Sequence, residues 1–262
     1  MRARGYKPFG TNLEQDALLD RIVAVAKPET VGVFDLDGCL FDTRIRLVTI
    51  FHEFASFKGA SGKGAEGRYF AFAERSDFTD WDLKKPLRKY GMPEAEIENI
   101  FKEFIAFWRE RFFSDAYVAW DDPMPGATDL VRACHDKGMS IVYLTGRDIN
   151  MRVGTEQALR RCGFPYDAER TRLLTKPRFE MEDTHFKMSA LEEIAEMGEV
   201  VLSIDNEPAN INSMTDRFPE ALCVHIETDH SFREDRPYKS IPRLRSFYRT
   251  TWPLAEETDF LE

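Results

Sequence analysis

Two aspartates separated by one residue are the part of this sequence best suited to chemistry. Asp35 and Asp37 follow the apolar run Val31-Gly-Val-Phe34, which is typical of a buried strand, and Gly38 comes directly after them. Two carboxylates this close repel one another unless a cation or a shared proton offsets their charge, which favours a functional pair. The alternative interpretation is turn chemistry, because Asp-Gly is a common turn sequence.

Polar residues also follow two later predicted strands. Asp35 and Asp37 follow strand 31–34, Thr145-Gly-Arg147 follows strand 140–144, and Asp205-Asn-Glu207 ends strand 199–205. The carboxyl ends of neighbouring strands in an open α/β sheet face one crevice, where ligands bind. Lys187, near the start of a predicted helix, can reach the same crevice. The sequence therefore predicts one polar site at this edge of a sheet.

Strands and helices alternate through the second half of the chain. The apolar periodicity predicts helices at about 127–137, 150–162, 186–197 and 208–217, and strands at 140–144, 172–174, 199–205 and 221–226. A further helix, capped by Thr11 or Asn12, precedes the first strand. Such alternation implies a parallel sheet with right-handed crossovers, so we predict an α/β fold with a Rossmann-like core.

Residues 43–122 read differently, as helices without strands. We predict helices at 45–57 and 93–113, a helical piece at 81–90, and a flexible loop at Gly59–Gly67. The loop resembles a P-loop only superficially, because Lys63 is followed by Gly64 and not by Ser or Thr. We therefore expect a core domain of residues 1–42 and 123–262 and a helical domain of residues 43–122.

The helical segment is rich in aromatic residues, which have two interpretations. They include Phe51, Phe54, Phe57, Tyr69, Phe70, Phe72 and Trp81. Most are expected to form the segment's own core. The alternative is an apolar roof over the polar site.

In order and spacing, these motifs resemble the four motifs of the haloacid dehalogenase-like (HAD) hydrolase superfamily. The motifs are Asp-x-Asp-Gly after a strand, a strand ending in Thr, a lone Lys on a helix, and a strand ending in acidic residues. The resemblance extends from about Val31 to Ile226. It implies a HAD fold with an α-helical cap at residues 43–122, inserted between the first and second motifs.

The resemblance also implies a role for each aspartate. Asp35 is expected to be the nucleophile that forms an aspartyl-phosphate, and Asp37 the general acid/base. Asp35, the backbone carbonyl of Asp37, and Asp205 are expected to bind Mg²⁺, which prefers oxygen ligands.

The remaining motif residues are expected to handle the phosphoryl group. Thr145 and the amide of Gly146 would donate to its oxygens, and Lys187 would offset the negative charge. Lys176 is the rival lysine, but the following proline disfavours entry into a helix. Arg147 has two open interpretations: contact with the substrate phosphate, or bracing of its loop.

Two positions depart from the commonest family pattern. Cys39 stands where many family phosphatases have Thr, which preserves a small side chain but introduces a thiol open to oxidation. Asn206 stands where a second Asp is frequent, which keeps an oxygen ligand but removes a charge and weakens the expected binding of Mg²⁺.

The composition bounds the class of protein. The 262 residues carry a formal net charge of −10, which works against general binding of nucleic acid. The segment 233–249 contains basic residues interleaved with aromatic ones, which we interpret as a solvated tail, with a basic groove as the alternative. No run approaches the roughly 18 apolar residues of a membrane span, and the segment Met1–Lys7 lacks the apolar stretch expected of a secretion signal. We expect a cytoplasmic protein without membrane contact.

Cysteine and histidine give no sign of a metal site. Cys39, Cys134, Cys162 and Cys223 contain no CxxC pair, and His225 and His230 lack ligand spacing. The sequence thus predicts a Mg²⁺-dependent phosphatase that hydrolyses a phosphomonoester of a small metabolite. The alternatives within the family are a polynucleotide end phosphatase and a phosphotransferase or phosphomutase. A non-catalytic phosphate- or protein-binding domain is the alternative from another class.

Overall fold

A six-stranded parallel sheet forms the centre of the protein. The computed structural model describes residues 13–228 and 235–249. Its strands are β1 (Thr30–Phe34), β4 (Ser140–Asp148), β5 (Thr171–Lys176), β6 (Glu199–Asp205), β7 (Leu222–Ile226) and β8 (Arg243–Leu244). Their order is β5-β4-β1-β6-β7-β8, and every neighbouring pair is parallel. The predicted α/β, Rossmann-like core is confirmed.

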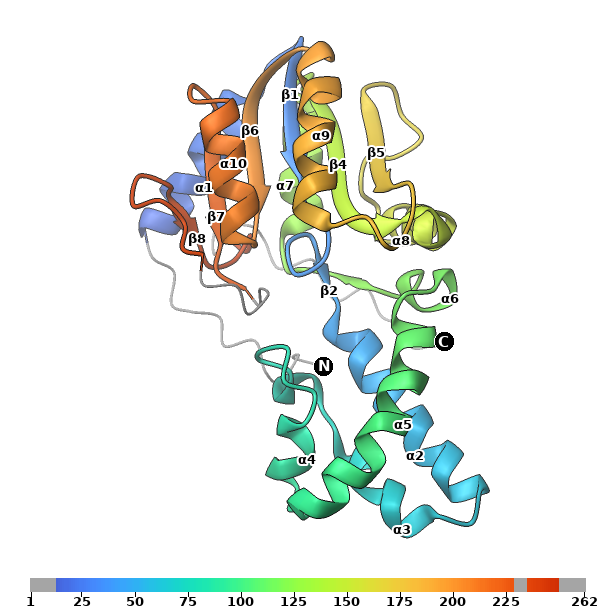
Figure 1. Cartoon of the computed structure of the whole chain (residues 1–262). Coiled ribbons are helices and arrows are strands. Elements are labelled where there is room, and N and C mark those ends of the chain that lie inside the picture. Colours follow the sequence, from blue (N-terminus) through green and yellow to red (C-terminus); the bar gives the residue numbers. More distant parts are fainter. Residues whose placement is uncertain (1–12, 229–234, 250–262) are drawn as a thin grey trace, which may run out of the picture.

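Helices cover both faces of this sheet (Figure 1). One face packs against α1 (Leu13–Val25), α7 (Ala127–Asp136) and α8 (Arg152–Arg161), and the other against α9 (Asp183–Glu196) and α10 (Pro208–Arg217). A short 3-10 helix, η3 (Ile149–Met151), precedes α8. The two apolar layers differ because alternate residues of each strand point to opposite faces.

The helical insertion lies between two short strands that form an antiparallel pair. Phe41–Asp42 (β2) pairs with Asp122–Pro123 (β3), so the chain leaves and re-enters the sheet region at one place. The insertion, residues 43–121, contains α2 (Arg44–Ala60), α3 (Gly64–Gly67), η1 (Arg68–Phe72), η2 (Arg75–Asp77), α4 (Lys85–Lys89), α5 (Glu94–Phe112) and α6 (Asp115–Val118). It lies beyond the carboxyl ends of the strands, below the sheet in Figure 1.

The insertion has an apolar core of its own. Phe51, Phe54, Phe70 and Phe104 are fully buried and contact one another, with ring centroids 4.7–5.3 Å apart. These contacts confirm that several of the aromatic residues form the core of the helical segment. Such aromatic pairs add about 0.5–1.5 kcal/mol each beyond the burial of their area.

The predicted flexible loop at Gly59–Gly67 is wrong in part. Helix α2 continues to Ala60, and Gly64–Gly67 forms the short helix α3. Glycine permits this packing, because a Cβ on Gly67 would lie 2.6 Å from the Cβ of Lys58. The helical piece expected at 81–90 is also shorter, since α4 covers only Lys85–Lys89.

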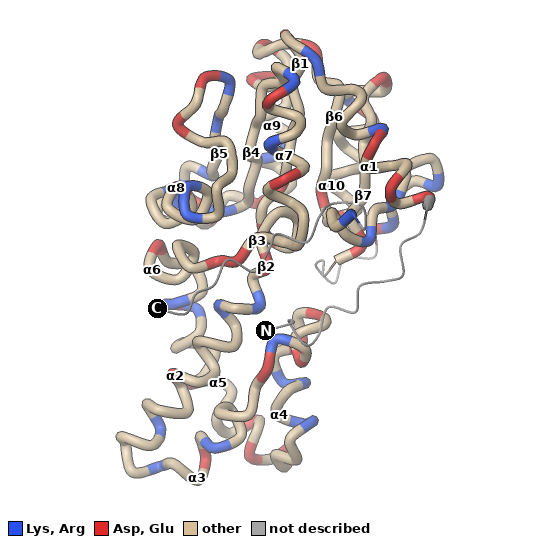
Figure 2. Tube along the Cα trace, turned by 180° about the vertical axis from the view of Figure 1, so that it is seen from behind, with Lys and Arg blue, Asp and Glu red and all other residues tan. Residues whose placement is uncertain are grey.

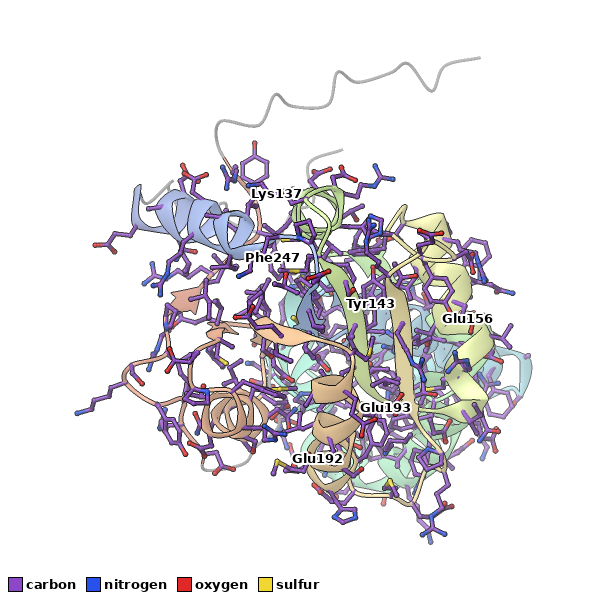
Figure 3. The ribbon with its side chains drawn as sticks, turned by 90° about the horizontal axis from the view of Figure 1, so that it is seen from above. Lys137, Tyr143, Glu156, Glu192, Glu193 and Phe247 are labelled. Carbon is purple, nitrogen blue, oxygen red and sulfur yellow. The ribbon has the colours of Figure 1, made fainter. Side chains whose placement is uncertain are left out.

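The C-terminal basic segment is not simply a solvated tail. Arg243 and Leu244 form β8, and Phe247 is fully buried on the sheet face covered by α1 and α7, where Figure 3 labels it. Arg243 and Arg245 both pair with Glu227, at 3.4 and 3.3 Å. Arg233 lies outside the described residues, as do Thr11, Asn12 and His230.

Acidic and basic residues are interspersed over both the sheet region and the insertion (Figure 2). Within the described residues, no helix combines the length and the apolar character that crossing a bilayer requires.

Candidate active site

Three of the predicted site residues meet at the carboxyl edge of the sheet. The Lys187 ammonium donates to Oδ1 of Asp35 at 2.5 Å and to Oδ2 of Asp205 at 2.8 Å. All three side chains are at least nine-tenths buried. Lys176, the rival lysine, instead donates to Asp183 at 2.6 Å. Lys187 is therefore the lysine that contacts the motif carboxylates.

The topology of the sheet explains this meeting. Strand β1 lies between β4 and β6, and the Asp35 amide extends the ladder by donating to the Ile204 carbonyl at 3.0 Å. After β1, the chain adds β4 and β5 on one side of this strand and then β6, β7 and β8 on the other side. The strand order therefore reverses at β1. A reversal of this kind opens a crevice at the carboxyl ends of the strands. Helix α9 packs over the same edge and supplies Lys187 from its second turn.

A tight turn gives the two aspartates separate surroundings. Strand β1 ends at Phe34, and Gly38 adopts a φ of 73°, a left-handed conformation that glycine adopts at low cost. The turn closes when the Phe41 amide donates to the Leu36 carbonyl at 2.8 Å. Asp37 therefore does not share the contacts of Asp35.

Asp37 is held by two arginines. Arg147 donates to it from Nε at 2.8 Å and from Nη2 at 3.0 Å, and Arg46 forms a further ion pair with it. The same two arginines pair with Asp121, at 2.6 Å from Arg147 and 2.7 Å from Arg46. Asp37, Arg147, Asp121 and Arg46 thus form a ring of alternating charge, which we call the charge ring.

The charge ring joins the sheet region to the insertion. Asp37 and Arg147 belong to the sheet region, whereas Arg46 is in the first turn of α2 and Asp121 precedes β3. Arg147 also donates to the Thr155 hydroxyl at 3.1 Å. Of the two interpretations of Arg147, these contacts agree with the one in which its side chain braces its own loop. Arg46 and Asp121 were not among the predicted site residues: the position of Arg46 at the start of a helix, nine residues after Asp37, was a usable signal, whereas Asp121 had none.

The pKa values of the carboxyls follow from these contacts. Burial raises the pKa of Asp35 well above its usual range, although the Lys187 ammonium acts in the opposite direction. Burial also acts to raise the pKa of Asp37, but Arg147 and Arg46 outweigh it and hold the pKa well below its usual range. Burial raises the pKa of Asp121 to about 6 despite the same two arginines.

The strand end at β4 supplies two further predicted residues. Thr145 is fully buried, and its hydroxyl accepts a hydrogen bond from the Arg147 amide at 3.2 Å. Gly146 lines a cavity beside Asp35. A Cβ at Gly146 would lie 2.7 Å from Oδ2 of Asp183, so glycine lets this loop approach α9 closely.

That cavity has a volume of about 180 Å³ and is lined by both parts of the protein. Asp35, Lys187 and Gly146 come from the sheet region, and Trp81 and Phe113 from the insertion. Of the aromatic residues considered as a roof, Trp81 therefore lines the cavity, whereas Phe51, Phe54 and Phe70 belong to the buried core of the insertion.

The donor set can accommodate a magnesium ion with few protein ligands. Asp35 and Asp205 converge on one cation, the Lys187 ammonium, at the edge of the cavity. No group of three or more Asp, Glu, His and Cys side chains suited to a metal occurs among the described residues. Mg²⁺ commonly takes one or two carboxylates and completes its shell with water and phosphate oxygens, so two carboxylates fit it. The Asp37 side chain is engaged in the charge ring, which leaves its backbone carbonyl as the expected third ligand.

The two departures from the family pattern lie close to these carboxylates. Cys39 is fully buried, and burial, with the charges of Asp35 and Asp205, raises the pKa of its thiol well above the usual range. A thiol of this kind is a poor nucleophile, which argues against the oxidation sensitivity expected from the sequence. Asn206 is buried beside Asp205, and His225 contacts its backbone carbonyl at 3.0 Å.

Comparison with known proteins finds similarity to solved structures. These include a HAD-superfamily hydrolase from Ehrlichia chaffeensis (14% identity over 85% of this chain and 94% of that one, TM-score 0.47). They also include CbbY from Rhodobacter sphaeroides in complex with phosphate (16% identity over 84% of this chain and 95% of that one, TM-score 0.44). A third is a class C acid phosphatase from Bacillus anthracis with tungstate bound (17% identity over 76% of this chain and 65% of that one, TM-score 0.36). No family model matches the sequence, and no curated protein does.

At these identities, and with TM-scores below 0.5, the similarity does not identify the reaction or the substrate of this chain. The reversal of strand order at β1 gives the protein a doubly wound α/β fold, and the order of its motifs resembles that of the HAD-like hydrolases.

Proposed function

We propose that this protein is a Mg²⁺-dependent phosphatase that hydrolyses a phosphomonoester of a small metabolite through an aspartyl-phosphate on Asp35. The observation that carries the proposal is the position of the Lys187 ammonium between the Asp35 and Asp205 carboxylates, at the edge of a cavity. A nucleophilic carboxylate, a fixed cation and a second carboxylate are the parts that phosphoryl transfer needs.

Each of these residues has a chemical task in the proposal. An oxygen of Asp35 attacks phosphorus, the bond from phosphorus to the ester oxygen breaks, and water later attacks the aspartyl-phosphate to release phosphate. Lys187 favours the ionised form of Asp35 against the burial that raises its pKa, and it offsets the charge that develops on the phosphoryl oxygens. The Gly146 amide and the Thr145 hydroxyl are the proposed donors to those oxygens. Mg²⁺, held by Asp35 and Asp205, would supply further neutralisation of charge.

Asp37 is the proposed acid/base, and its surroundings oppose the gain of a proton. Because Arg147 and Arg46 hold its pKa well below the usual range, Asp37 is ionised, and the same contacts make it a weaker base toward the attacking water. To protonate the leaving oxygen it must first carry a proton, which both guanidiniums oppose. The proposal therefore includes a loosening of the Arg46 contact, which comes from the insertion, before the ester bond breaks.

The size and charge of the site favour a small substrate over a nucleic acid end. The cavity of about 180 Å³ lies below the usual range of ligand pockets, roughly 300–1,000 Å³. Arg46, Arg147 and Lys187, which line it, are each paired with two carboxylates and offer little to a polynucleotide backbone. A phosphotransferase or phosphomutase would share the same first step and differ in the acceptor.

Hydrolysis of an aryl phosphate tests the proposal. Wild type should release phosphate with Mg²⁺ and lose this activity with a chelator, and Asp35→Asn should lower kcat by at least about 10³-fold because the nucleophile is absent. Asp136→Asn is the matched control, since Asp136 is an exposed aspartate at the end of α7 that does not line the cavity, and it should retain full activity. If the wild-type protein is inactive across a series of divalent metals, the proposal that it is a phosphatase is refuted.

A second set of reactions separates the alternatives. We expect nucleoside monophosphates and other small esters to be hydrolysed faster than a terminally phosphorylated oligonucleotide. Equal or preferred use of the oligonucleotide would favour the end phosphatase instead. Transfer of phosphate to an added alcohol in preference to water would favour the phosphotransferase.

A further inference from the structure

We propose that the substrate is the phosphate monoester of an uncharged alcohol that carries an aromatic ring, with Trp81 and Phe113 as the residues that select the ring. This inference rests on the proposed function and names the leaving group that the phosphatase accepts. It is carried by the aromatic side chains of the cavity and by the pairing of its cations.

Trp81 and Phe113 are the aromatic side chains of the cavity wall that can contact a ligand. Both are only partly buried, and both line the cavity that contains Asp35. Phe112 also lines it but is buried: the Arg46 guanidinium lies 4.3 Å from its ring centroid, and Trp108 stacks on it at 5.0 Å. Phe112 therefore acts as a fixed support, and the Trp81 ring packs against it edge to face at 6.0 Å.

These two aromatic rings are held by packing and not by polar contacts. The Trp81 Nε1 group has no hydrogen-bond partner among the described residues. Phe113 contacts the ring of Phe179, from the sheet region, at 5.0 Å. A flat ring entering between such side chains gains edge-to-face or stacked contacts that a saturated ring of similar size cannot make.

The charges of the cavity argue against a second anionic group on the substrate. Its three cationic side chains, Arg46, Arg147 and Lys187, are each paired with two carboxylates. Asp183 and Glu207 add further carboxylates to the lining. A carboxylate or second phosphate on the leaving group would lose its hydration without gaining a cation in return.

Three synthetic esters test both parts of the inference. Benzyl phosphate and cyclohexylmethyl phosphate are both esters of primary alcohols and have leaving groups of similar size, so the comparison isolates the aromatic ring. An aryl phosphate would not serve here, because phenols leave more readily than alcohols. 4-Carboxybenzyl phosphate adds one negative charge to the first ester. We expect kcat/KM for benzyl phosphate to exceed that of each of the other two by about three- to tenfold.

Substitutions identify the side chains that are responsible. Trp81→Leu and Phe113→Leu should each reduce the ratio of benzyl to cyclohexylmethyl phosphate toward one while the saturated ester is still hydrolysed. Phe57→Leu is the matched control, because Phe57 is an exposed aromatic residue of α2 that does not line the cavity, and it should leave the ratio unchanged. Circular dichroism establishes that each variant is folded.

Binding to Asp35→Asn, measured by calorimetry with the same esters, gives a readout that needs no catalysis. Equal affinities and equal kcat/KM for benzyl and cyclohexylmethyl phosphate would overturn the aromatic selection while leaving the phosphatase intact. Equal use of 4-carboxybenzyl phosphate would overturn the charge argument. A ratio that survives both leucine variants would overturn the assignment to Trp81 and Phe113. If wild type hydrolysed none of these esters and no aryl phosphate, the proposed function would fail, and this inference with it.

Discussion

Arg147 donates two parallel hydrogen bonds to the Asp37 carboxylate, from Nε to Oδ2 at 2.8 Å and from Nη2 to Oδ1 at 3.0 Å. This bidentate geometry fixes both the position and the rotation of the carboxylate. Arg147 also donates to Asp121 and to Thr155. The orientation of the proposed acid/base therefore depends on an arginine side chain that is itself held by these two further contacts.

Arg147→Lys should therefore reduce catalysis although it keeps the positive charge. A lysine ammonium cannot reproduce the fork of hydrogen bonds to Asp37, so the carboxylate is less well oriented. We expect kcat for an aryl phosphate to fall roughly 10- to 100-fold, with a smaller change in KM. Arg152→Lys, in the first turn of α8 and paired with Glu156, is the control and should keep wild-type kcat. Equal kcat for wild type and Arg147→Lys would show that charge alone is sufficient.

Asp121 gives the free energy of unfolding a pH dependence of unusual sign. Its pKa is raised by burial to about 6 in the folded protein, against about 3.9 in an unfolded chain. Between these values the folded state binds more protons, so the contribution of Asp121 is favourable below about pH 4 and is lost as the pH rises through about 6. Asp121→Asn removes this contribution.

The measurement is urea unfolding of wild type and Asp121→Asn at several pH values from 4 to 7. The stability of the variant relative to wild type should increase with pH, by roughly 3 kcal/mol in total. Asp129→Asn, at an exposed position in the first turn of α7, controls for the loss of a carboxylate. A difference that moves the other way with pH would mean that the two arginines dominate burial.

Much of the fold follows from local patterns in the sequence. Buried parallel strands read as apolar runs, and the structure has the predicted strands at 140–144 and 199–205, with β4 continuing to Asp148. The pairing of β2 with β3 is two residues long on each side and has no periodicity to detect. Helix α3 was missed because glycine lowers helix propensity, while its close packing on Lys58 is a tertiary contact.

The candidate site likewise contains contacts that local sequence patterns predict and contacts that depend on the tertiary fold. Asp35 and Asp205 were expected together because the carboxyl ends of neighbouring parallel strands lie at one edge of a sheet, and Lys187 was expected to reach that edge from the start of a helix. The structure brings the three into contact. The charge ring was not expected, because the contact of Arg46 with Asp121 depends on how the insertion folds back on its own start. No spacing in the sequence indicates that contact.

Lys187→Met should connect the stability of the protein to Mg²⁺. Without the ammonium, Asp35 and Asp205 are two buried carboxylates facing one another, and removal of one partner from a buried pair costs about 3–5 kcal/mol. A divalent cation can replace the missing charge, so added Mg²⁺ should raise the Tm of the variant more than that of wild type. Lys102→Met, at an exposed lysine of α5, is the control. If Mg²⁺ shifts neither Tm, Asp35 and Asp205 do not form a metal site.

Gly154→Ala tests the contact that seats the insertion on the sheet region. Gly154 in α8 donates its amide to Oδ1 of Asp115 in α6 at 2.6 Å, and a Cβ there would lie 2.2 Å from the Asp115 carbonyl oxygen. Because the obstructing atom is backbone, α6 must move, at a cost of about 1–3 kcal/mol in the free energy of unfolding. That movement would shift Trp81 and Phe113, the aromatic residues of the cavity wall, and so raise KM.

Gly59→Ala is the control, because the added Cβ meets nothing within 4 Å inside α2. This substitution should instead raise the free energy of unfolding by up to about 1 kcal/mol. Opposite signs in urea unfolding, with KM raised only in Gly154→Ala, are the expected result, and equal effects would show that the α6–α8 contact does not position the insertion.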